Sequence, residues 1–185
     1  MMLPTDDSLR THVHPVELLY EDHSLILSKL RAAEDRIEAE RKGRRAYDRN
    51  YWVDLAQFLH IFADIEHHAK EEQILFTAMQ HEGVIVEGGP IGFMLAEHEE
   101  GRALIKRIEE ASSEGREEET RNVAQAFIEL SRQHIWKENE ILFKLAIKVL
   151  PEEVCQDVFH QLDRLEAHHR TRHSQTWLDE LLRSI

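Results

Sequence analysis

Two ten-residue stretches of this chain carry the same pattern of potential metal ligands. Residues 67–76 read HHAKEEQILF and residues 134–143 read HIWKENEILF, and each stretch holds a histidine and a glutamate four positions apart. Side chains with this spacing lie on one face of an α-helix, one turn apart, where both can bind the same ion. The two copies therefore predict two helices that contribute to one symmetric metal site through His67, Glu71, His134 and Glu138.

An acidic residue followed by histidine precedes each motif, as Asp22-His23 and Glu97-His98. Ligands on antiparallel helices meet only if they lie equally far from the connecting turn. The distance from His23 to the end of its predicted helix equals that from the start of the next helix to His67, about 30 Å at 1.5 Å per residue. The corresponding distances from His98 to the turns on either side of its helix also agree with those of its neighbours. We therefore expect His23 and His98 to complete the site.

Four imidazoles and two carboxylates without thiolates suit iron, manganese or zinc and argue against an iron–sulfur cluster. Two carboxylates among four imidazoles indicate a metal pair bridged by both glutamates. Two six-coordinate ions offer twelve positions, of which the six side chains fill eight and an oxo or hydroxo bridge fills two. One vacant position on each metal implies a small diatomic ligand or peroxide as the binding partner.

The neighbouring pair His68 and Glu72 has the same spacing and could set a different register. Lys70 and the Ile-Leu-Phe triplet align with the second motif only if His67 and Glu71 are the ligands. An α-helix would point His68 about 100° away from His67. We therefore expect His68 behind the ligands or on the surface, and Lys70 as an exposed partner.

Helical periodicity runs through the chain, interrupted by 7 glycines and 4 prolines. The expected helices span about 15–41, 48–80, 90–111, 117–149 and 151 to nearly 185. The prediction is an all-α, up-down-up-down four-helix bundle with an additional C-terminal fifth helix. Its parts would be an N-terminal segment (1–14), the bundle (15–150) and a C-terminal helix (151–185) packed on the bundle or on a partner chain.

Four segments of the chain, EDHSLI, HHAKEEQILF, EGGPIGFMLAEHEEGR and HIWKENEILF, resemble the hemerythrin-like (HHE cation-binding) family over roughly residues 15–150. The resemblance implies a four-helix bundle that holds two non-haem iron ions. The ligands that it implies are His23, His67, Glu71, His98, His134 and Glu138. Family members bind or sense oxygen, handle nitric oxide or peroxide, or serve iron homeostasis.

The chain departs from the oxygen carriers of that family on the third helix. They have HxxxH there, whereas Arg102 stands at the second position of this chain. With four histidines, the chain resembles the branch linked to nitrosative stress and iron repair more than the carriers. Arg102 is expected either as a surface charge or at the access route to the vacant metal position.

The six ligands alone leave three functions open. The first is a protein that binds or senses O2, NO or peroxide. The second is an enzyme that reduces NO or decomposes peroxide, and the third is an iron-storage or iron-donation protein. Proton donors near the vacant positions, such as Tyr20, Tyr51 or a histidine of the fifth helix, would favour the enzyme. A buried apolar cavity would favour the carrier or sensor.

Composition limits the possible partners and cellular location of the protein. A net charge of −13 argues against nucleic acid as a partner, and no apolar run is long enough for a membrane span. The N-terminus does not resemble a signal peptide, and the lone Cys155 fits a reducing cytoplasm. We expect a cytoplasmic monomer or homodimer. His60 is expected to pack in the core or behind the ligands, and surface positions are the default for His160, His168, His169 and His173.

Overall fold

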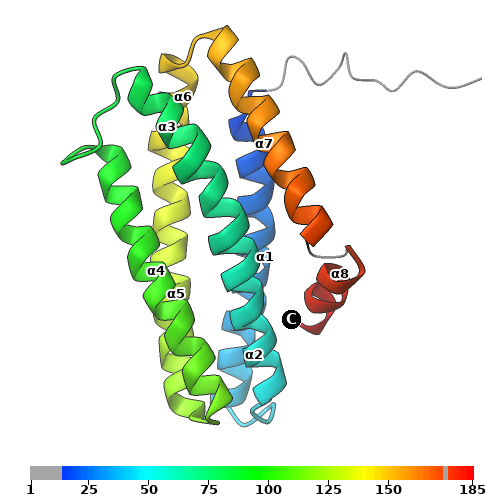
Figure 1. Ribbon diagram of the computed structural model, residues 1–185. Helices are drawn as coiled ribbons and strands as arrows, with labels where there is room; N and C mark the ends of the chain where they lie inside the picture. Colours follow the sequence, from blue (N-terminus) through cyan, green and yellow to red (C-terminus); the bar gives the residue numbers. More distant parts are fainter. Residues whose placement is uncertain (1–13, 173–174) are drawn as a thin grey trace, which may run out of the picture.

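The chain folds as an antiparallel bundle of four long helices with two further helices at its C-terminal end (Figure 1). The computed structural model describes residues 14–172 and 175–185, without the side chains of residues 168–178. Helices account for all regular structure in these described ranges. The predicted all-α bundle is confirmed.

Two of the four bundle helices are continuous α-helices, and two contain π-helical turns. The continuous ones are α1 (Val16–Arg41) and α4 (Pro90–Ser113). The second bundle helix joins α2 (Arg49–Phe58), η2 (Leu59–His68), η3 (Lys70–Leu75) and α3 (Phe76–His81). The fourth joins α5 (Glu117–Lys137), η4 (Glu138–Leu142) and α6 (Phe143–Val149). The π-helical segments overlap the two repeated motifs, η2 and η3 the first and η4 the second. Turns of this kind are frequent at functional sites.

Local signals set the ends of these helices. The carboxylate of Asp48 accepts hydrogen bonds from the backbone N–H groups of Asn50 and Tyr51 at the start of α2. Pro90 occupies the first turn of α4, where its missing N–H costs nothing. Gly115, with φ of 71°, forms the turn between α4 and α5 in a conformation that side-chain-bearing residues rarely adopt.

Apolar clusters fill the bundle on both sides of its middle. One cluster includes Leu30, Trp52 and Ile108, and the other includes Leu19 and Phe143, all of them fully buried. Burial of a large apolar side chain stabilises a fold by about 1.5–3 kcal/mol. The two clusters therefore hold the helices rigidly at either end and fix the distance between them at the level where the polar side chains lie.

The C-terminal segment packs on the bundle of its own chain. The expected single helix from residue 151 to nearly 185 is two helices, α7 (Glu152–Arg172) and α8 (Gln175–Ser184). Val158 and Leu162 of α7 pack against Ile74 of η3. At the other end, Leu181 of α8 joins the large core cluster. Among the described residues, no helix has the length and apolar content that crossing a membrane requires.

Candidate metal centre

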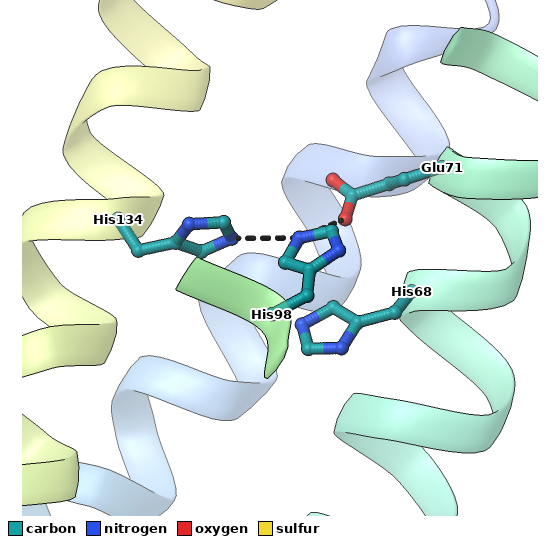
Figure 2. Close-up of side chains that lie close together, drawn as sticks. All are labelled: His68, Glu71, His98 and His134. Atoms are coloured by element: carbon teal, nitrogen blue, oxygen red, sulfur yellow. Dashed lines mark hydrogen bonds and ion pairs between the residues drawn. The ribbon is translucent and has the colours of Figure 1, made fainter. Parts of the chain in front are cut away.

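Histidine and glutamate side chains from all four bundle helices meet in the middle of the bundle. They form two groups, His23, His67, Glu71 and Glu138 in one and His68, Glu71, His98 and His134 in the other. Within each group, one potential ligand atom per residue lies within 4.8 Å of all the others. The structure thus brings together all six residues expected from the sequence and adds His68. Figure 2 shows the second group, His68, Glu71, His98 and His134.

Both glutamates extend towards both groups. Glu71 places Oε1 3.5 Å from Nε2 of His67 and Oε2 3.5 Å from Nε2 of His98. Glu138 places Oε2 3.1 Å from Nε2 of His23 and 3.2 Å from Nε2 of His134, while its Oε1 lies 3.7 Å from His98. Each carboxylate therefore has the arrangement needed to bridge two ions.

These buried groups have no adequate protein partners for their charges. Glu71 and Glu138 are 0% exposed, and none of their four oxygens accepts a well-directed hydrogen bond. Nε2 of His23 is also without a hydrogen bond, and the Nε2 atoms of His98 and His134 face each other at 3.1 Å. Unpaired buried charge costs several kcal/mol. A bound cation would neutralise the carboxylates and use every inward-facing lone pair, so the residues fit a metal centre.

Outer partners orient the imidazoles through their other ring nitrogen. His67 Nδ1 donates to Asp22 at 3.2 Å and His134 Nδ1 donates to Glu97 at 3.1 Å. His23 Nδ1 donates to the side-chain oxygen of Asn139 at 2.7 Å. Such contacts fix the ring tautomer so that Nε2 faces inward as an acceptor, as metal-ligating histidines require.

The lysine of each repeated motif binds the acid behind its histidine. Lys70 donates to Asp22 at 2.9 Å, and Lys137 makes the equivalent contact with Glu97. Lys70 is 4% exposed, so its expected surface position was wrong. The sequence reasoning found the acid-histidine pairs but assigned no role to Asp22 and Glu97. The recurrence of lysine three positions after each histidine was the signal that could have identified them.

The electrostatics of the site keep two imidazoles neutral. Burial lowers the pKa of His67 to about 4 and that of His68 to about 3. Burial and the neighbouring charge of Glu138 raise the pKa of Glu71 well above its usual value. Burial opposes ionisation of Glu138 too, but the facing imidazoles, His134 foremost, bring its pKa well below the usual range. Neutral imidazoles are the form that binds metal.

The expected position of His68 was wrong. Its ring stacks on that of His98, with centroids 3.8 Å apart and planes inclined by 11°. The reason is the π-helical hydrogen bonding of η2, which ends at His68. A π-helical turn contains more residues than an α-helical turn, so consecutive side chains diverge less and His67 and His68 both face the bundle interior.

Arg102 is partly exposed, with 29% of its side chain accessible, which agrees in part with the surface charge expected for it. It donates to Asp64 and Glu72, each at 2.6 Å, and also pairs with Glu99. Glu72 in turn accepts from His98 Nδ1 at 2.7 Å. Arg102 therefore lies behind the metal-binding groups and holds the acids that contact them.

A small cavity adjoins the second group of ligands. Its volume is about 30 Å³, and the imidazoles of His67, His68, His98 and His134 form part of its wall. The remaining wall is mainly apolar and includes Ile26, Ala63, Gly101, Phe127, Leu130 and Ile135. Ser131 and Glu97 add a hydroxyl and a carboxyl group to this lining. About one water-sized molecule fits such a volume.

Other histidines lie apart from the two groups. His60 contacts Asp64 at 3.7 Å, but its side chain is 55% exposed, so its expected core position was wrong. His160 is exposed, as expected. The side chains of His168 and His169 and the whole of His173 lie outside the described residues.

A four-helix bundle with buried histidine and glutamate clusters in its middle defines a helical metal-binding protein. Residues 14–146 match the family model of the hemerythrin HHE cation binding domain, so the chain belongs to that family. This match confirms the resemblance found in the sequence and indicates cation binding. Searches of curated proteins and of solved structures found no match.

Proposed function

We propose that this protein holds two non-haem iron ions and binds or senses a small ligand, which is O2, NO or peroxide. The ligands are the six residues expected from the sequence, His23, His67, Glu71, His98, His134 and Glu138. The observation that carries the proposal is that two fully buried carboxylates each reach both groups of imidazoles and accept no well-directed hydrogen bond. Two bridging carboxylates imply two ions.

Iron suits this donor set, which combines imidazole nitrogen with carboxylate oxygen and has no thiolate. An iron pair would supply redox chemistry and open coordination positions. The protein contributes fixed ligand geometry through the acids behind each ring. It also contributes a surrounding of apolar side chains that limits access of water.

The cavity supports binding or sensing over turnover. Its volume of about 30 Å³ suits a diatomic molecule, and its wall is mainly apolar. Apart from the imidazoles, its polar side chains are Ser131 and Glu97, and the carboxylate of Glu97 is held by His134 and Lys137. Tyr51 packs on Trp52 in the core cluster that lies to one side of the metal centre. Tyr20 donates its hydroxyl to the backbone carbonyl of Asn139 at 3.2 Å. Neither tyrosine lines the cavity.

The position of the Tyr20 hydroxyl supports the enzymatic alternative. Its partner Asn139 also accepts from His23, so the phenol lies one residue behind a ligand. Burial raises the pKa of Tyr20, which keeps it protonated. An enzyme that reduces NO or decomposes peroxide needs such a donor, so Tyr20→Phe should slow turnover if turnover occurs.

Metal analysis tests the di-iron assignment. Protein purified from iron-replete cells should contain about two irons per chain, and His67→Ala and Glu138→Ala should each lower that number. His160→Ala, an exposed histidine, is the matched control and should retain both ions. One or no iron in the wild type, with both site variants unchanged, would overturn the proposal.

Optical spectroscopy then separates the functions. The protein is reduced under anaerobic conditions. Separate samples of it are then exposed to NO, to peroxide and to O2. A stable, reversible spectral change supports binding or sensing and rules out a dedicated reductase. Rapid multiple turnover of NO or peroxide rules out a simple carrier and favours the enzyme.

A further inference from the structure

His68 lies where a ligand would lie, although it stands outside both HxxxE pairs. Figure 2 shows its ring beside those of His98 and His134, with Glu71 extending towards them from the same bundle helix as His68. The stacked rings of His68 and His98 have centroids 3.8 Å apart. The four residues satisfy the distance requirement for one ion, with each offering one atom.

The surroundings of His68 resemble those of the other inward-facing histidines. Its Nδ1 lies 3.5 Å from Oδ1 of Asp64, on the side of the ring that carries the outer partner in His67 and His134. This Nδ1 is buried and has no well-directed hydrogen bond.

One guanidinium group holds the acids behind two of the histidines. Arg102 Nε donates to Asp64, which faces His68, and another Arg102 nitrogen donates to Glu72, which accepts from His98. Two charge-assisted hydrogen bonds of 2.6 Å fix both carboxylates. Arg102 thus links the outer partners of His68 and His98 across two bundle helices.

We propose that His68 is a fifth imidazole ligand of the centre and that Arg102 is the residue that positions it. This inference rests on the proposed metal function. The centre is then asymmetric, with three imidazoles on the side of His98 and two on the side of His23. Repeating the ligand count with five imidazoles leaves one of twelve positions vacant, on the side of His23 and His67. His67 also lines the small cavity, so a ligand in the cavity could still reach that position.

A direct count of coordinated imidazoles tests this proposal. The protein is loaded with Co²⁺, whose unpaired electrons strongly shift the proton resonances of bound ligands. Each histidine bound through Nε2 then gives one strongly shifted, solvent-exchangeable Nδ1–H signal in the NMR spectrum. We expect five such signals in the wild type and four in His68→Gln. His60→Gln, which removes an exposed imidazole from the other side of Asp64, should retain five.

Arg102→Gln tests the positioning role through a separate readout. It should retain five shifted signals but bind Co²⁺ about 10–100-fold more weakly, the usual cost of removing an outer partner. Arg132→Gln is the matched control, because Arg132 pairs with Glu34 away from the centre and should leave the affinity unchanged. An affinity of Arg102→Gln equal to that of the wild type would overturn the positioning role.

The outcomes separate this inference from the proposed function. In one outcome, the wild type binds two ions but gives four shifted signals, and His68→Gln keeps all four. That result would overturn the role of His68 but would agree with the centre of six ligands. Failure of the wild type to bind two ions would overturn the proposed function itself. The number of shifted signals in the wild type shows by itself whether five imidazoles are bound, even if His68→Gln does not fold.

Discussion

The metal-free protein should lose stability in acid because the fold keeps His68 neutral. Burial lowers the pKa of His68 from 6.5 to about 3. Below pH 6.5 the unfolded chain takes up a proton at His68, whereas the folded protein does so only near pH 3. His68 therefore contributes stability that is present above pH 6.5 and is lost as the pH falls through this window.

The size of the loss follows from the pKa difference. At pH 5 the solution is about 1.5 units below the unfolded pKa, and each unit corresponds to about 1.4 kcal/mol, which gives about 2 kcal/mol for His68. His67, with a pKa lowered to about 4 by burial, adds a loss of similar size, while the raised pKa of His98 acts in the opposite direction. A comparison with a variant isolates the contribution of His68.

His68→Gln removes this proton uptake from both states. The difference in free energy of unfolding between variant and wild type should shift by about 2 kcal/mol in favour of the variant between pH 7.5 and pH 5. Urea denaturation with chelator present measures it, and His60→Gln controls for loss of an exposed imidazole. A difference for His68→Gln that does not change with pH would refute the reasoning that burial keeps this imidazole neutral.

Three further predictions follow from individual side chains. Lys70→Met should cost about 3 kcal/mol in free energy of unfolding, because Asp22 keeps a poorly solvated charge, whereas Lys137→Met should cost under about 1 kcal/mol. Urea denaturation compares them, and equal costs would contradict the difference in burial. Gly101→Ala should stabilise α4 by about 1 kcal/mol. Its new Cβ would lie 3.8 Å from Phe127, in the cavity wall, so NO binding should slow in stopped-flow measurements; an unchanged rate would show that the ligand does not use the cavity. Tyr51→Phe should stabilise the protein by about 1 kcal/mol, since the hydroxyl is buried without a partner. Burial raises the pKa of Tyr51 to about 12, so the free energy of unfolding of the wild type should fall as the pH rises from 10 to about 12. An equal fall in Tyr51→Phe would contradict the assignment of this loss to Tyr51.

The helices could be predicted closely because their signals are local. The first was expected at residues 15–41 and spans Val16–Arg41, and the third was expected at 90–111 and spans Pro90–Ser113. Helical periodicity, a proline in a first turn and glycine after the last turn are readable without knowledge of any neighbour. The C-terminal segment was less predictable, and its expected single helix is two in the structure.

The gathering of His23, His67, Glu71, His98, His134 and Glu138 could also be predicted. Repetition of the motif fixed the register, and equal distances to the turns placed the ligands at one level. Repetition and equal distances did not give the roles of Asp22 and Glu97, although the recurring Lys70 and Lys137 were a sequence signal for an acidic partner. Each acid contacts a histidine on another bundle helix, and sequence spacing does not give the lateral orientation of two helices.

The sequence by itself determined which helices form and which six residues lie at the same depth, because both depend on spacing along the chain. Only the tertiary structure decided that His68 joins them and that Arg102 holds the acids behind His68 and His98. The expectation for His68 assumed α-helical geometry, whereas the chain there is π-helical. Packing of the four helices around one polar centre, through contacts between residues distant in sequence, decides which side chains face inward.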